Sequence, residues 1–204
     1  MSTTRMTAAV LAMAGAAAIS SAQIELTTNG GFEAGDTSGW DSFPTLGSSF
    51  NVTSDANSGD FAGELFNDVE ASGALIKQAN IGVGVVNPGD EITISFAAKG
   101  STANGGVVFA EFFSEIDGGG VSMSEILSGG PLPLTDTYQM FSFTTNAASD
   151  VSGGVTLQFG AITGAVQDSV AVLFIDDVSV TVIPAPGAVA LLGVGGVVAT
   201  RRRR

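Results

Sequence analysis

Hydrophobic and polar residues alternate over short stretches in the middle of the chain. In EITISFAA, residues 91–98, the side chains of Ile92, Ile94, Phe96 and Ala98 fall on one face of an extended strand. This period of two is typical of a strand with one face buried in a core. Comparable stretches recur between turns rich in Gly, Asn, Pro and Asp. We expect strands at Gln23–Thr28, Phe50–Thr53, Phe61–Phe66, Ala74–Ala79, Glu91–Ala98, Val107–Phe113, Tyr138–Thr145, Val155–Phe159 and Val170–Val182.

The spacing of these stretches predicts an all-β fold. No segment between the two ends of the chain keeps a 3.6-residue period, and short strands between Gly-rich turns indicate an antiparallel β-sandwich or a barrel. VVFAEFF, residues 107–113, is apolar at both parities and predicts a central strand. Residues 114–136, which contain Gly118-Gly119-Gly120, are expected to form a mobile excursion, and no strand is predicted within them.

The last predicted strand, residues 170–182, carries an acid in an apolar row. If the valine face is the core, Asp176 is a buried carboxylate, which is costly unless it is paired or neutralised. Lys77 and Lys99 are the only basic residues in the middle of the chain. A bound cation is the simplest compensation, and Ca²⁺ suits carboxylate and carbonyl oxygens. The residues expected on this core face with Asp176 are Val170, Val172, Phe174, Val178, Val180 and Val182.

The two ends of the chain differ from its middle. Residues 1–22 combine an early arginine, an apolar run and small residues before Gln23, which predicts a cleaved signal peptide and export. Residues 23–183 contain two lysines and all 20 acidic residues, a formal charge of −18. Residues 184–204 combine a Pro-Ala-Pro-Gly turn, an apolar run and four terminal arginines. Because arginines stay on the cytoplasmic side, this tail predicts transient membrane insertion, although its apolar run is shorter than the ~20 residues of a full span.

Residues 183–204 resemble the PEP-CTERM sorting signal of Gram-negative bacteria, which has a Pro-Glu-Pro motif, an apolar helix and an arginine cluster. Pro184, Ala185 and Pro186 stand at the motif, with alanine in place of its glutamate. The resemblance implies an exosortase-type membrane protease as partner and a location at the cell surface or in an exopolysaccharide-containing matrix. A weak C-terminal membrane anchor is the alternative. The arginine cluster of the signal is Arg201, Arg202, Arg203 and Arg204.

Composition excludes several classes of chemistry. The chain has no cysteine and no histidine, so disulfide frameworks, thiolate nucleophiles, Ser-His-Asp triads and histidine-ligated metals are absent. The net charge of −13 argues against a nucleic-acid backbone as partner.

Three motifs of residues 23–183 resemble the galactose-binding-like jelly roll that many carbohydrate-binding modules share. They are NGGFEAGDTSGW at 29–40, SGDFA at 58–62 and FIDDVSV at 174–180. The resemblance implies a jelly-roll β-sandwich across the whole of residues 23–183.

The same resemblance implies a structural calcium site. In that family the ion lies near the glutamate of the first strand and the aspartate of the last, which correspond to Glu33 and Asp176. Carbonyl groups around Gly31 and in the turn that ends at Asp60 would complete the site. The alternative is that both carboxylates accept hydrogen bonds from backbone amides at a strand end.

Aromatic residues suited to stacking on sugar rings are few. The only tryptophan, Trp40, is expected in the core, and Tyr138 is the candidate ligand-binding residue at the rim of a sheet. We expect an exported, non-catalytic cell-surface or matrix protein that contacts exopolysaccharide. The alternatives are a structural matrix protein without sugar binding and, third, a glycosidase that uses Glu111 and Glu115 or Asp176 and Asp177, for which the separation of the carboxylates would decide.

Overall fold

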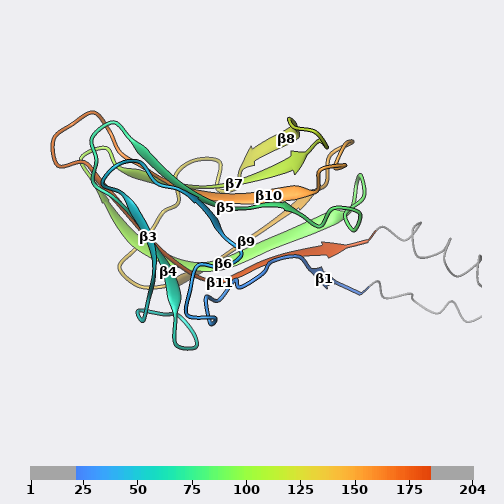
Figure 1. The fold of residues 1–204 in the computed structure, drawn as a ribbon, viewed down its shortest axis with the longest axis horizontal. Helices are drawn as coiled ribbons and strands as arrows, with labels where there is room; N and C mark the ends of the chain where they lie inside the picture. The colour runs from blue at the N-terminus through green and yellow to red at the C-terminus, as the bar shows by residue number, and fades with distance from the viewer. Residues whose placement is uncertain (1–21, 185–204) are drawn as a thin grey trace, which may run out of the picture.

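The structure is a computed structural model that describes residues 22–184, which form two antiparallel β-sheets packed face to face (Figure 1). No helix occurs in this range, and hence none that could cross a membrane. Sheet A has the strand order β3 (Ser49–Thr53), β4 (Ala62–Asn67), β11 (Val170–Ile183), β6 (Glu91–Ala103) and β9 (Gln139–Asn146), and β1 (Ile24–Glu25) pairs with β11. Sheet B has the order β2 (Asp41–Phe43), β5 (Gly73–Ile81), β10 (Val155–Ile162), β7 (Val107–Glu115) and β8 (Val121–Ile126).

This arrangement confirms the predicted antiparallel jelly-roll β-sandwich. All nine predicted strands have a counterpart: six are longer than predicted by one to five residues, two are shifted by one residue, and the first is reduced to Ile24–Glu25. Two strands were missed. Strand β2 has only three residues, too few for a periodic pattern. Strand β8 lies inside residues 114–136, so the prediction of an excursion without strands is wrong for Val121–Ile126, whose edge position leaves its side chains mostly exposed.

The core lies between the two sheets. The predicted face of β6 is confirmed, because Ile92, Ile94, Phe96 and Ala98 are all fully buried. From sheet B, Phe159 of β10 meets Phe96 edge to face, with ring centres 4.9 Å apart. An aromatic contact of this kind stabilises a core beyond the area that it buries. This contact joins β6 of one sheet to β10 of the other.

A β-bulge divides β11 into halves of opposite parity. The register with β6 shifts between Asp176 and Ser179, and Asp177 has a left-handed φ of 50°. One extra residue in a strand transfers the following side chains to the other face. The prediction of one continuous core face is therefore wrong for Val170, Val172 and Phe174, which lie half-buried on the outer face of sheet A. The buried apolar residues of β11 are Ala171, Leu173 and Ile175 before the bulge, and Val178, Val180 and Val182 after it.

The motif at residues 29–40 joins the start of the domain to its last strand. Gly30 accepts a hydrogen bond from the amide of Val178 through its carbonyl, and a Cβ at this position would lie 1.9 Å from the carbonyl oxygen of Val178. Only glycine permits that approach. Phe32 is fully buried and stacks on Trp40, whose indole donates a hydrogen bond to the Asn29 carbonyl. The expectation that Trp40 is a core residue is confirmed.

Both sheets bend in the same direction. In Figure 1 the strands of sheet B dip in the middle and those of sheet A wrap beneath them, so the outer face of sheet B is on the concave side of the sandwich. The outer face of sheet A is on the convex side.

Candidate functional site

The outer face of sheet B carries a polar row between apolar side chains. Alternation along β5 and β7 buries one set of residues and leaves the other facing outward at intermediate exposure, and Gln158 of the otherwise mostly buried β10 also faces outward. We call this outward set the sheet B face. Its residues are Phe43, Leu75, Lys77, Phe109, Glu111, Phe113 and Gln158.

The polar row runs across the middle of the sheet B face. Cross-strand register places Asp41 opposite Lys77, Lys77 opposite Gln158, and Gln158 opposite Glu111. The Gln158 side chain donates a hydrogen bond of 2.8 Å to Glu111. Residues opposite each other on one face of a sheet are in side-chain contact distance. The row therefore presents an amide, two carboxylates and one ammonium group along a line perpendicular to the strands.

Phenylalanine rings flank this row. Phe43, 51% exposed, lies opposite Leu75 on one side of the row, and Phe109 follows in the same cross-strand line beyond Gly160. Phe113, opposite Thr156, lies on the other side of the row. The Lys77 ammonium lies 5.0 Å from the centre of the Phe43 ring, within cation–π distance. Aromatic surface beside hydrogen-bonding groups is the combination that binding sites for small polar ligands use.

One end of the sheet B face opens into a polar pocket of about 460 Å³. The loop after β7 forms one wall, and it is held in place because the Asp117 amide donates to the Ser152 hydroxyl at 2.9 Å. Gly118 and Gly119 in this loop have left-handed φ values of 81° and 110°, and no heavy atom lies within 4 Å of a Cβ built on either. The other lining residues are Lys77, Ala79, Asn80, Val83, Glu115, Ile116 and Gly153.

Carboxylates outnumber cations on this surface. The row and the pocket contain Asp41, Glu111, Glu115 and Asp117 but a single lysine, Lys77. A negative surface repels an anionic ligand but does not repel an uncharged polar ligand.

The sequence predicted none of the Phe residues of this face as a site. VVFAEFF is apolar at both parities, so it gave no signal that separates the buried Phe112 from the outward Phe109 and Phe113. Phe43 belongs to β2, which was not predicted. The only available signal was the charge of Glu111 at one parity of a run that is otherwise apolar.

The predicted metal ligands lie at the opposite side of the fold, where β11 bulges. Asp176 is fully buried and accepts hydrogen bonds from the amides of Asn57 at 2.8 Å, Ser58 at 2.9 Å and Asp177 at 2.7 Å. Glu33 accepts the amides of Asp60 and Phe61, each at 3.1 Å. Burial raises the pKa of the Asp176 carboxyl, and the amide hydrogen bonds oppose this effect.

These hydrogen bonds match the alternative interpretation of Glu33 and Asp176, in which both carboxylates accept hydrogen bonds from backbone amides. Gly31 adjoins Asp176, since a Cβ on Gly31 would lie 3.7 Å from Oδ1, but Asp60 contributes its amide hydrogen to Glu33. Among residues 22–184 no three Asp or Glu residues group as a metal site would require, and no buried side-chain oxygen lacks a hydrogen-bond partner. In the structure, backbone amides donate hydrogen bonds to both carboxylates. Calcium binding stays a prediction; a calcium-dependent rise in melting temperature after chelation, lost in Asp176→Asn, would establish it.

Tyr138, the predicted ligand-binding residue, lies just before β9 on the convex side. Its hydroxyl donates a hydrogen bond of 2.6 Å to the Asp55 carbonyl, and the Lys99 ammonium lies 4.8 Å from its ring centre. Burial and the nearby carboxylates of Asp176 and Asp55 raise the pKa of this phenol well above its ordinary range. Tyr138 is therefore half-buried and engaged by neighbours, away from the sheet B face.

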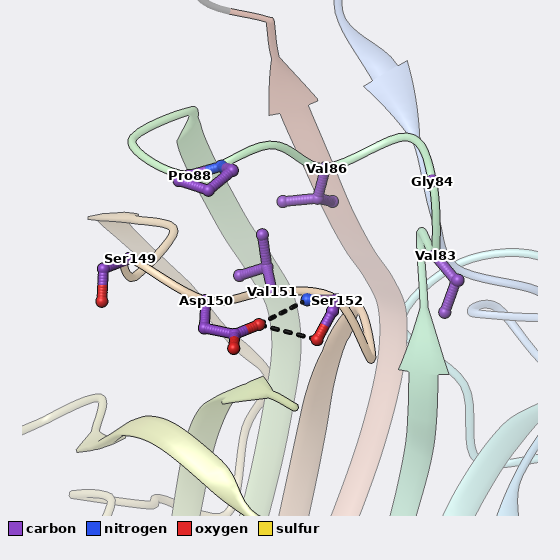
Figure 2. A pocket seen from close by; sticks show the side chains of 8 residues that line it. All are labelled: Val83, Gly84, Val86, Pro88, Ser149, Asp150, Val151 and Ser152. Carbon is purple, nitrogen blue, oxygen red and sulfur yellow. Dashed lines mark hydrogen bonds between the residues drawn. The ribbon is translucent and has the colours of Figure 1, made fainter. Parts of the chain in front are cut away.

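A second pocket, of about 380 Å³, lies at the end of the sandwich beside the last strand (Figure 2). Its lining is mostly apolar, from Val83, Val86 and Val151, and its one carboxylate, Asp150, is bound by the Ser152 amide at 3.0 Å and hydroxyl at 2.7 Å. Polar groups do not converge into it, so it is a weaker candidate than the sheet B face. Pro184 is the last residue described, and Ala185, Pro186 and the arginine cluster lie outside the described residues.

Comparison with known proteins supports the fold. No family model matches the chain, and no curated protein matches it in sequence. A xylan-binding domain of Paenibacillus barcinonensis Xyn10C, a family 22 carbohydrate-binding module, aligns with a TM-score of 0.55 and 14% identity over 79% of this chain and 94% of that one. The fold is carbohydrate-binding-module-like.

Two other solved structures share this fold. A cyclase from Fischerella sp. TAU aligns with a TM-score of 0.57 and 15% identity, over 80% of this chain and 99% of the cyclase. The enzymatically active domain of a tailspike protein of bacteriophage CBA120 aligns with a TM-score of 0.60 and 17% identity, over 78% of this chain. The match spans only 22% of the tailspike chain. A carbohydrate-binding-module-like sandwich thus occurs in binding modules and in enzymes, and the site decides between them.

Proposed function

We propose that this protein binds carbohydrate through the sheet B face and acts as a non-catalytic component of the cell surface or extracellular matrix. The observation that carries the proposal is the polar row of Lys77, Gln158 and Glu111 on the concave side of the sandwich, with the rings of Phe43 and Phe109 on one side of it and that of Phe113 on the other. Sugar rings have apolar C–H faces and a polar edge of hydroxyl groups. The phenylalanine rings can pack against the C–H faces, and the polar row can form hydrogen bonds with the hydroxyl groups.

The ligand that fits best is an uncharged polysaccharide. The face extends across neighbouring strands, so it can follow several sugar units of one chain. Its excess of carboxylates repels uronate or sulfate groups. An exopolysaccharide with neutral segments meets both conditions.

A catalytic role is disfavoured by the state of the candidate acids. Glu111 is hydrogen-bonded by Gln158, and the Asp176 carboxylate is enclosed by three backbone amides. A glycosidase needs two carboxyl groups free to face one glycosidic bond. In neither pair predicted from the sequence, Glu111 with Glu115 or Asp176 with Asp177, are both carboxyl groups free of hydrogen bonds.

Export and sorting complete the proposal. The features of residues 1–22 and 184–204 support secretion, and the resemblance of the tail supports processing by an exosortase-type protease. Intact mass spectrometry of the protein from its native cell surface tests this. A mass that begins at Gln23 and lacks the arginine cluster agrees with the proposal, and a full-length C-terminus contradicts it.

Binding is tested with a glycan array, followed by calorimetry on the polysaccharide that gives the strongest signal. Phe43→Ala removes an exposed ring at a sheet edge and should weaken binding about tenfold or more, since it loses most of one aromatic contact. Met140→Ala is the matched control, because Met140 is 64% exposed but lies on the convex side. Equal binding by wild type and Phe43→Ala would contradict the assignment of binding to the sheet B face. No binding to any neutral glycan would favour the alternative of a structural matrix protein without sugar binding.

A further inference from the structure

The convex side of the sandwich also has a pocket, built around Lys99. The pocket has a volume of about 220 Å³ and is lined by Lys99, Gly100, Ser101, Asp136 and Phe174. We call it the Lys99 pocket. Lys99 and Phe174 lie opposite each other on β6 and β11. The Gly100 amide donates to the Thr135 carbonyl at 2.8 Å, which brings the loop that carries Asp136 against the sheet.

The ammonium group of this pocket is fixed in place by its neighbours. Lys99 forms an ion pair of 2.6 Å with Asp55, and its side chain is only 14% exposed. The nitrogen lies 4.8 Å from the centre of the Tyr138 ring and 5.1 Å from that of Phe174. The Tyr138 hydroxyl binds the Asp55 carbonyl and so holds both partners of the ion pair together. A side chain restrained in this way loses little freedom when a ligand binds.

Charge in the pocket favours an uncharged ligand. Asp55 neutralises Lys99, Asp136 adds a free carboxylate, and Glu64 lies opposite Phe174 on β4. This surplus of negative charge would repel an anionic ligand. A ligand cation would find the rings of Tyr138 and Phe174 already in contact with the lysine ammonium.

We propose that the Lys99 pocket binds a single neutral sugar unit. Phe174 offers an apolar surface, the Asp136 carboxylate accepts hydrogen bonds from two adjacent hydroxyls, and the Ser101 hydroxyl supplies a further hydrogen-bonding group. The volume is below the ~300 Å³ at which sites for larger ligands begin, so the pocket suits one ring or a chain end. Tyr138 acts here as a positioning residue for Lys99.

Two sites on opposite sides of the sandwich would allow one molecule to hold two glycans. The sheet B face takes a stretch of one chain and the Lys99 pocket a terminal or branching unit of another. This consequence, unlike the pocket itself, rests on the proposed function of the sheet B face. Cross-linking of this kind gives a matrix protein avidity without new contacts.

The test is a titration of ¹⁵N-labelled full chain with glucose, galactose, mannose and xylose, with choline and phosphate as charged comparisons. We expect at least one sugar to shift the amides of Gly100, Ser101 and Asp136, with about tenfold weaker binding in Asp136→Asn, which loses a charged acceptor. Met140→Ala, on the same side and outside the pocket, should bind as wild type does. No sugar-dependent shift at these amides, or larger shifts with choline or phosphate, would overturn the proposal.

Phe43→Ala separates this inference from the proposed function. In that variant the sugar shifts at the Lys99 pocket should persist while polysaccharide binding is weakened. If the shifts vanish together with polysaccharide binding, the Lys99 pocket is not an independent site and the proposal fails. If polysaccharide never binds but the shifts persist, the proposed function fails and the pocket stands.

Discussion

The carboxylate of Asp176 shows how one residue can be both costly and required. It is fully buried, and its three amide hydrogen bonds close the loop of Asn57 and Ser58 onto the bulge of β11. Burial of a charge opposes folding, while charge-assisted hydrogen bonds favour it. In the folded protein desolvation is the larger of the two effects, because the pKa of Asp176 is raised above its ordinary value of 3.8.

This raised pKa predicts a pH dependence of stability. A carboxyl that holds its proton more tightly in the folded state contributes most stability below pH 3.8, and this contribution is lost as pH rises through the folded pKa. Asp176→Asn should cost about 1–3 kcal/mol, because at least one buried amide loses its acceptor. Urea unfolding of both proteins should show this difference shrinking as the pH rises above 3.8. A difference that grows with pH would mean that the hydrogen bonds outweigh desolvation.

Individual site residues were predictable only where a motif fixed them. The Gly-Trp motif predicted the core position of Trp40, which is buried, whereas the stacking of Phe32 on Trp40 and the close approach of Gly30 to the last strand were not predicted. Phe43 and Phe109 belong to no motif. Their outward position depends on cross-strand register, which is a property of the assembled sheet.

At the scale of single elements, the bulge in β11 is the feature that most changes the fold. It allows the same strand to place Ile175 and Val178 in the core with two acids between them. Asp177 takes the left-handed φ of 50°, and its carboxylate accepts hydrogen bonds from the side-chain amide of Asn57 at 2.8 Å and from the Ser58 hydroxyl at 2.6 Å. Asp176 and Asp177 thus belong to the geometry of the bulge in β11.

Substitution at Asp177 tests the backbone of the bulge. Asp177→Gly and Asp177→Val both lose the two hydrogen bonds, but only valine is strained at a positive φ. Asp177→Val should therefore be less stable than Asp177→Gly by about 1–2 kcal/mol in urea or thermal unfolding. Equal stabilities would show that residue 177 does not take a left-handed conformation in solution.

Strands with strong periodicity were predicted and weak ones were not. The pattern of EITISFAA located β6 and its buried face correctly, since each core position is apolar. The position of β11 was predicted correctly, but the predicted core face was wrong for its first half, because periodicity alone does not reveal an inserted residue. Strand β8 was missed because an edge strand buries little, and its sequence VSMSEI resembles a polar loop.

At the scale of the whole molecule, charge is the dominant property. Residues 23–183 carry two lysines against all 20 acids, and one of these lysines, Lys99, is paired with Asp55. Mutual repulsion of this size destabilises the compact state and keeps the protein apart from other anions.

Salt should therefore stabilise the protein. Raising the ionic strength from about 0.01 M to about 0.15 M shortens the screening distance from ~30 Å to ~8 Å. We expect the melting temperature to rise by roughly 2–4 °C for each 1 kcal/mol of repulsion that is screened. A melting temperature that falls over this range would show that ion pairs outweigh repulsion.

The sandwich has two outer faces: the concave sheet B face, where we propose that glycan binds, and the convex face with the smaller Lys99 pocket. Sequence motifs predicted the sandwich, but the sites on its two faces became visible only with the strands in register. The central claim is that the sheet B face is where a glycan chain lies.

The most direct measurement is amide hydrogen exchange with and without the strongest polysaccharide ligand of the array. We expect protection to increase along β5, β10 and β7 and in the loop of Asp117, Gly118 and Gly119. Strand β9, which carries Met140 on the convex side, should exchange at the same rate in both samples. Increased protection on β9 with none on β5 and β7 would contradict the account.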